Sequence, residues 1–140
     1  MLTLGILLAG SARAEGAWLT SWDEAVKQSK STGKPILIDF TGSDWCGWCI
    51  KLKKEVFDTA EFQAWAKKRV ILLECDFPQN KPQSAQVKKQ NEELSTKYNI
   101  EGYPTILFVD AKGTVLGQYG YDEGGPKTWT ANADKMLAKK

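Results

Sequence analysis

The chain has no histidine, and only three of its 140 residues are cysteine. Cys46 and Cys49 are separated by two residues, a spacing that can supply half of a zinc site. A structural zinc ion takes four ligands, most often from Cys and His. Because Cys75 is the one remaining candidate of either type, the sequence argues against zinc, and we expect no bound metal.

The sequence also lacks an excess of charge of either sign, since 19 basic and 17 acidic residues leave a net charge of +2. So small a net charge creates no strong attraction for nucleic acid or anionic lipid, and we expect neither as a partner. The basic clusters at 51–54 and 67–69 are predicted to lie on solvated helix faces. An ordinary globular composition and a length of 140 residues predict one domain, which we expect to be a monomer.

No apolar run in the first residues is long enough to span a bilayer, because the run from Leu2 to Gly10 is short. Ala12 and Ala14 follow it with the small side chains that a signal peptidase requires. The usual positive charge before the apolar run is missing. We therefore predict an atypical signal peptide, residues 1–14, cleaved after Ala14, with the domain at 15–140 and a periplasmic or secreted location. An N-terminal core segment is the alternative.

The remaining pattern alternates helices and strands. Helices are expected at 21–31, from Cys46 through 57, at 58–68, 84–98 and 126–138, and strands at 35–40, 70–76, 105–109 and 114–119. Ser21 and Asp58 are predicted helix caps, each followed three residues later by Glu. The apolar run at 70–76 indicates a central strand, and 110–113 has the turn residues of a hairpin. This order predicts an α/β fold, a mixed sheet with helices on both faces.

Trp45-Cys46-Gly47-Trp48-Cys49 lies between the apolar strand at 35–40 and a helix. The unpaired N–H groups and the positive dipole end at a helix N-terminus favour a thiolate at Cys46. Cys49 lies about one turn deeper, where it can attack any disulfide that Cys46 forms. The pair is therefore a candidate redox centre, with no cofactor beyond its own disulfide.

Trp-Cys-Gly-Trp-Cys after an Ile-Leu-Ile-Asp-Phe strand resembles the thioredoxin superfamily, in particular its secreted bacterial members, over about residues 18–138. This resemblance implies the thioredoxin fold, with four to five strands in a mixed sheet. It also implies that Pro104 takes a cis bond beside the dithiol, which would free the backbone of Tyr103 to pair with a substrate segment. An ordinary trans proline in a turn is the alternative.

The resemblance further implies that Asp39, in the strand before the motif, is a buried carboxylate that exchanges a proton with Cys49. Two departures bear on this role. The connection at 41–44 is one residue longer than in the simplest thioredoxins, and Leu72 replaces the lysine expected opposite the carboxylate. Glu74 could face Asp39 instead, and a purely structural or solvent-facing Asp39 remains the alternative.

Trp45, Gly47 and Trp48 surround the thiols, and exposed aromatic rings there would offer apolar contact to a flexible client. Trp48 departs from the proline of thioredoxin and from the histidine of strong oxidants and isomerases. Cys75 lies in an apolar run. We predict a buried, inert thiol there, with an intermolecular disulfide as the alternative.

Together these features predict an enzyme, a thiol–disulfide oxidoreductase that reduces protein disulfides through a mixed disulfide on Cys46. Its partners would be protein thiols and disulfides, and a membrane-bound thiol carrier could supply electrons. Net oxidation or isomerisation of disulfides is the alternative within the enzyme class. A binding module with a structural Cys46–Cys49 disulfide is the alternative of another class, although so small a ring would add little stability.

Overall fold

The computed structural model of the chain describes residues 18–138, so the predicted cleavage after Ala14 lies outside the described residues. The elements in chain order are α1 (Trp22–Thr32), β1 (Ile36–Thr41), α2 (Gly47–Leu52), the π-helical turn η1 (Lys53–Phe57), α3 (Ala60–Arg69), β2 (Ile71–Asp76), α4 (Ala85–Lys97), β3 (Thr105–Val109), β4 (Val115–Tyr119) and α5 (Gly125–Ala138). Within this range no helix is both long and apolar enough to cross a membrane.

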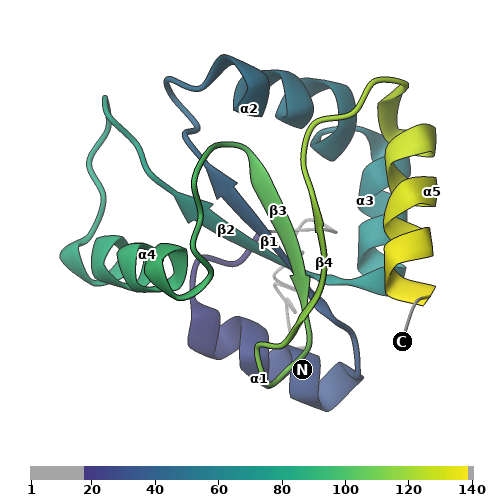
Figure 1. Cartoon of the computed structure of the whole chain (residues 1–140), viewed down its shortest axis with the longest axis horizontal. Coiled ribbons are helices and arrows are strands. Elements are labelled where there is room, and N and C mark those ends of the chain that lie inside the picture. The colour runs from purple at the N-terminus through teal and green to yellow at the C-terminus, as the bar shows by residue number, and fades with distance from the viewer. Residues whose placement is uncertain (1–17, 139–140) are drawn as a thin grey trace, which may run out of the picture.

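The four strands form one mixed sheet in the order β2-β1-β3-β4 (Figure 1). β1 runs parallel to β2 and antiparallel to β3, and β3 and β4 form the predicted hairpin. The prediction that the 70–76 run is a central strand is wrong, because β2 lies at one end of this order. Leu19 explains the apolar character of β2. The backbone of Leu19 forms hydrogen bonds of 2.9 Å to Leu72 and Glu74 and covers the outer side of the strand.

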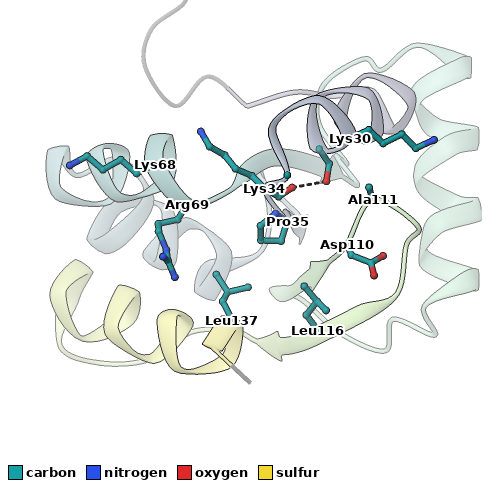
Figure 2. Close-up of a pocket in the computed structure, with 11 residues that line it drawn as sticks. Lys30, Lys34, Pro35, Lys68, Arg69, Asp110, Ala111, Leu116 and Leu137 are labelled. Atoms are coloured by element: carbon teal, nitrogen blue, oxygen red, sulfur yellow. Dashed lines mark hydrogen bonds between the residues drawn. The ribbon is translucent and has the colours of Figure 1, made fainter. Parts of the chain in front are cut away.

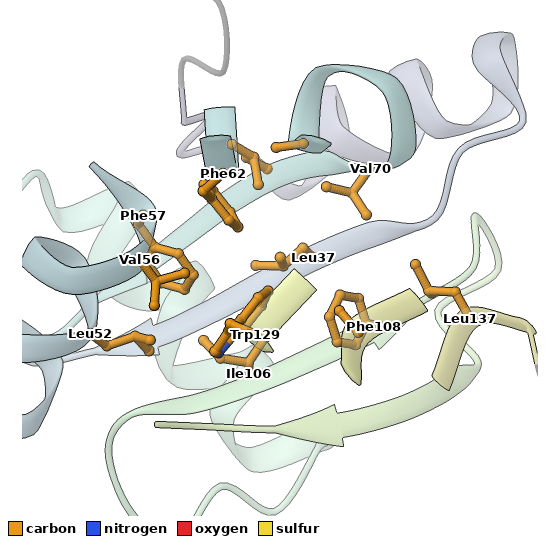
Figure 3. Packing of buried hydrophobic residues seen from close by; sticks show 13 residues of the cluster. Leu37, Leu52, Val56, Phe57, Phe62, Val70, Ile106, Phe108, Trp129 and Leu137 are labelled. Atoms are coloured by element: carbon orange, nitrogen blue, oxygen red, sulfur yellow. The ribbon is translucent and has the colours of Figure 1, made fainter. Parts of the chain in front are cut away.

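Helices cover both faces of the sheet, as the sequence predicts. In Figure 1, α3 and α5 lie side by side on the right, across the sheet from α4. One core joins the sheet to α2, η1, α3 and α5, and Trp129 lies near its centre, fully buried among Leu37, Phe57, Phe62 and Phe108 (Figure 3). The second core joins the sheet to α1 and α4. Alternate residues of β1, β2 and β3 enter opposite cores, as the period of a strand requires.

Helix ends follow local side-chain chemistry. Ser21 caps α1 as predicted, because its hydroxyl accepts a hydrogen bond from the N–H of Glu24 at 3.2 Å. The cap of α3 is Thr59 instead of the predicted Asp58. Thr59 accepts from the N–H of Phe62 at 3.2 Å, whereas Asp58 pairs with Lys53. α3 therefore begins one residue later than predicted, with a hydroxyl in the capping role.

Candidate redox site

Cys46 and Cys49 form a disulfide at the start of α2, with their Cα atoms 5.2 Å apart. Cys46 is the N-cap of this helix, and its sulfur accepts a hydrogen bond from the N–H of Cys49 at 3.3 Å. The N–H of Cys46 itself bonds to the carbonyl of Gly42 at 2.9 Å, which closes the turn between β1 and α2. The two predicted cysteines are therefore brought together at the start of a helix, where an N–H group without a partner inside the helix donates to the Cys46 sulfur.

The turn that carries the thiols is tied to the loop after β2. The N–H and hydroxyl of Ser43 both donate to the carboxylate of Asp76. The carboxylate of Asp44 accepts from the N–H groups of Gln79 and Asn80 at 3.0 and 2.8 Å. These bonds hold the connection between β1 and α2 in a fixed position at the end of the sheet.

Trp45 is 39% exposed, yet its indole is fixed in place. Its N–H donates to the carbonyl of Phe77 at 2.7 Å, and its ring meets the edge of Tyr103 at a centroid distance of 5.8 Å. A Cβ atom at Gly42 would overlap the indole, so the close approach of ring and backbone requires glycine there. The aromatic ring beside Cys46 is thus presented in one orientation.

Tyr103 lies beside the disulfide, and Pro104 follows it in the chain. The carbonyl oxygen of Tyr103 is 3.7 Å from the sulfur of Cys46, and the Tyr103–Pro104 peptide bond is cis. A Cβ atom at Gly47 would meet no atom within 4 Å, so the surface above the first turn of α2 is open. The surroundings of the disulfide therefore include Gly47, Tyr103, Pro104 and the tryptophans Trp45 and Trp48.

Trp48 is 57% exposed and contacts a residue that sequence reasoning missed. Its ring lies 5.1 Å from that of Tyr121, in the segment after β4. Lys51 and Glu55 also belong to this cluster. Their spacing of four residues is a helical signal that the sequence carries, whereas the contact between positions 48 and 121 follows from the tertiary fold.

Asp39 is buried on the sheet face that α2 covers, the face that also carries Leu37. Its register partner on β2 is Glu74, and Leu72 pairs with Leu37 in the core. Burial raises the pKa of Asp39 well above its ordinary value, and the carboxylates of Glu74 and Asp76 raise it further. One carboxylate oxygen of Asp39 has no hydrogen-bond partner. The sheet thus sets the two carboxylates of Asp39 and Glu74 side by side.

The pKa of Glu74 is raised as well. Burial is the largest cause of its raised pKa, and Asp76 adds to it, while Lys81 and Lys53 act in the opposite direction. Lys81 also pairs directly with Asp76 at 3.3 Å. The positive charge that faces this acidic group is therefore supplied from the loop after β2 and from η1.

Cys75 is fully buried, as predicted, in the core opposite the redox site. Burial, followed by the charges of Asp39 and Glu74, raises the pKa of its thiol. No cluster of three or more metal-ligating side chains occurs in the described part of the chain.

A hollow of about 720 Å³ lies near the start of β1 and the turn after β3, away from the disulfide (Figure 2). Its lining includes Lys30, Lys68, Arg69 and Asp110. In Figure 2 the ammonium groups of Lys30 and Lys68 point in opposite directions, away from the centre. Arg69 pairs with Asp134 at 3.2 Å. The charged groups of Lys30, Lys68 and Arg69 therefore do not converge on this hollow.

The buried carboxylate predicts a pH effect on stability. Between the unfolded pKa of Asp, about 3.9, and the raised folded value, the folded protein holds a proton that the unfolded chain has lost. Asp39 therefore reduces the free energy of unfolding as pH rises, by up to about 1.4 kcal/mol per pH unit. Asp39→Asn should be more stable than wild type at neutral pH, with a difference that shrinks toward pH 4.

Urea unfolding of the oxidised protein across pH 4–8 measures this difference. Asp23→Asn serves as the control for loss of a carboxylate at the surface, since Asp23 is exposed in the first turn of α1. A difference between Asp39→Asn and wild type that stays constant over the whole range would contradict a buried Asp39 that holds its proton.

Comparison with known proteins agrees with this geometry. A relative named disulfide bond reductase DsbH, from Chlamydia pneumoniae, is 37% identical over 117 residues, which cover 84% of this chain and 70% of the relative. A solved structure titled DsbH Oxidoreductase superposes with a TM-score of 0.85 and 35% identity, covering 91% of this chain and 88% of that one. The thiol:disulfide interchange protein DsbD of Klebsiella pneumoniae is 35% identical over 91 residues, which make up 65% of this chain but 13% of DsbD.

The likeness to DsbH, together with the Cys46–Cys49 disulfide, supports a thiol–disulfide oxidoreductase. The model of one family, described as a thioredoxin-like domain, matches residues 22–125. Because this match spans most of the chain and the DsbH relative is more than one third identical, the protein belongs to the thioredoxin-like domain family.

Proposed function

We propose that the protein reduces protein disulfides, with Cys46 as the attacking thiol and Cys49 as the resolving thiol. The observation that carries this proposal is the Cys46–Cys49 disulfide at a helix start, bordered by two exposed tryptophans and by the Tyr103 carbonyl. A permanent structural disulfide would not need exposed aromatic residues beside it, whereas a client disulfide needs a surface to bind.

The proposed reaction has two exchange steps. The Cys46 thiolate attacks one sulfur of the client disulfide, a mixed disulfide forms, and the first client thiolate leaves. The Cys49 thiolate then attacks the Cys46 sulfur, and the second client thiolate leaves as the Cys46–Cys49 disulfide closes. Two electrons pass from the protein to the client, and each released thiolate takes up a proton.

The neighbouring residues have distinct proposed roles. Tyr103, held next to Cys46 by the Pro104 segment, would pair through its backbone with an extended client segment. Asp39, on the sheet face beneath α2, would take the proton from Cys49 as that thiol becomes a nucleophile, since its raised pKa suits it to accept one. Trp45, Gly47 and Trp48 would form the open surface against which the client lies.

We further propose that the protein works outside the cytoplasm and receives electrons from a membrane-bound thiol carrier. The apolar run at 2–10 and the small residues at 12–14 favour export. The relative DsbH is named a reductase, and the DsbD relatives are named thiol:disulfide interchange proteins. Oxidation or isomerisation of clients is the alternative direction, and it would use the same two thiols.

Insulin reduction tests the activity. The dithiothreitol-reduced protein should reduce the interchain disulfides of insulin and precipitate its B chain, and Cys46→Ser should lose this activity because the attacking sulfur is gone. Cys75→Ser is the matched control, since Cys75 is buried in the other core. A wild-type protein without insulin reduction would favour the binding module with a structural disulfide.

Replacing the resolving thiol should trap clients. In Cys49→Ala the mixed disulfide on Cys46 cannot be released by intramolecular attack. Non-reducing gels of extracts from the producing cells should therefore show adducts that disappear with dithiothreitol. The double variant Cys46→Ser/Cys49→Ala should show none, and equal adducts in both variants would exclude Cys46 as the attacking thiol.

The reduction potential tests the direction of electron flow. Trp48 offers the Cys46 sulfur no hydrogen bond comparable to the histidine of strong oxidants, and its ring lies against Tyr121 and Lys51. We therefore expect a potential of about −270 mV, as in thioredoxin, and not about −120 mV, as in the strongest oxidants, a gap of roughly 7 kcal/mol. Equilibration with glutathione measures it. A value above about −170 mV would overturn the reductase assignment in favour of an oxidase.

A further inference from the structure

Within the described part of the chain, most of the exposed large hydrophobic side chains lie near the disulfide. Among residues 18–138, four large hydrophobic side chains are exposed, namely Trp45, Trp48, Ile50 and Val115. Three of the four lie within four residues of Cys46, although water contact of such side chains is unfavourable. A surface of this kind indicates contact with an apolar group of another molecule.

The ring of Trp48 is held by groups from two parts of the chain. Tyr121 lies against it at a centroid distance of 5.1 Å with the planes tilted by 49°. The ammonium group of Lys51 lies 5.1 Å from the centre of the Trp48 ring and 5.2 Å from the centre of the Tyr121 ring. Both rings therefore share one cation, an arrangement that favours a single placement of Trp48.

Tyr121 is itself anchored. Its hydroxyl donates a hydrogen bond of 2.6 Å to the carboxylate of Glu55, and its ring packs against the core that contains Trp129. The same Glu55 carboxylate lies 4.0 Å from the ammonium group of Lys51. The bond to Glu55 is the main cause of the raised pKa of Tyr121. The contact to Trp48 thus rests on a group with fixed geometry.

Fixing an exposed side chain matters for binding because a mobile side chain loses conformational entropy when a partner orders it. The Trp48 side chain is already ordered in the folded protein, so it loses little conformational entropy when a client binds. Trp45, on the other side of Cys46, is fixed by separate contacts to Phe77 and Tyr103. A client cystine at Cys46 therefore has an aromatic surface of set geometry on either side.

We infer that Tyr121, supported by Lys51 and Glu55, is a positioning residue that fixes Trp48 as the contact for a large apolar side chain next to the client's cysteine. This inference rests on the proposed disulfide exchange at Cys46 and adds a preference among its clients. The preferred client is an unfolded or extended protein segment in which an aliphatic or aromatic residue flanks the attacked disulfide. A disulfide flanked by small polar residues gains nothing from Trp48.

Two synthetic peptides test the inference. Each is closed by one disulfide, and they differ in a single residue next to the first cysteine, which is Leu in one and Ser in the other. Single-turnover reduction by the reduced protein, followed at increasing peptide concentration, separates the apparent dissociation constant from the limiting rate. Wild type should prefer the Leu peptide by about fivefold in the ratio of second-order rate constants, and the difference should lie in the dissociation constant.

Variants then assign this preference to the cluster. Tyr121→Ala and Lys51→Met should bring the Leu-to-Ser ratio close to one, and Tyr121→Phe, which keeps the ring, should retain most of it. Lys51 is half exposed, so its variant tests the cluster even if Tyr121→Ala does not fold. Lys54→Met is the matched control for loss of a positive charge, because Lys54 is an exposed lysine in η1, and it should keep the wild-type ratio.

The ratio cancels any change in thiol reactivity, because both peptides meet the same Cys46. A wild-type ratio near one, or an unchanged ratio in both Tyr121→Ala and Lys51→Met, would overturn the inference while leaving disulfide reduction in place. Reduction of neither peptide by a wild-type protein with free thiols would overturn the proposed function as well.

Discussion

The first turn of α2 imposes the constraint on which the site depends: its N–H groups have no partners within the helix, and they need an acceptor. The sulfur of Cys46 meets this need for the N–H of Cys49. The same bond that caps the helix stabilises negative charge on the sulfur once the disulfide is reduced. The Cys46 sulfur thus both caps the helix and belongs to the redox pair, and a shift in its position would break the capping hydrogen bond.

Below this turn, the sheet sets a second constraint through its register. β1 and β2 are parallel with Asp39 opposite Glu74, so a buried carboxylate faces a half-buried one. β2 contains no lysine that could offset their negative charge. The positive charges come instead from Lys81 and Lys53, outside the sheet. Burial and like charge both raise the pKa of Asp39, so its carboxylate binds a proton more tightly than that of an exposed aspartate.

Much of this arrangement follows from the sequence because its determinants are local. The strand before the motif, the thiol spacing and the Ser21 cap each depend on neighbouring residues. The edge position of β2 could not be predicted, since an apolar run is equally typical of a central strand, and Leu19, far away in sequence, covers it. The pairing of Asp39 with Glu74 needed the strand register, and the Tyr121 contact joins positions 73 residues apart.

The covering of β2 by Leu19 has a consequence for how the protein meets other chains. A bare sheet edge pairs readily with a strand from any partially unfolded protein, and unfolded proteins are the clients proposed here. Leu19 occupies the backbone groups of β2 at Leu72 and Glu74, and the opposite edge strand, β4, pairs with β3 through an irregular register. Both edges are therefore poor templates for added strands. Backbone pairing with an extended client is therefore confined to the Tyr103 segment proposed above, and the edges of the sheet add none.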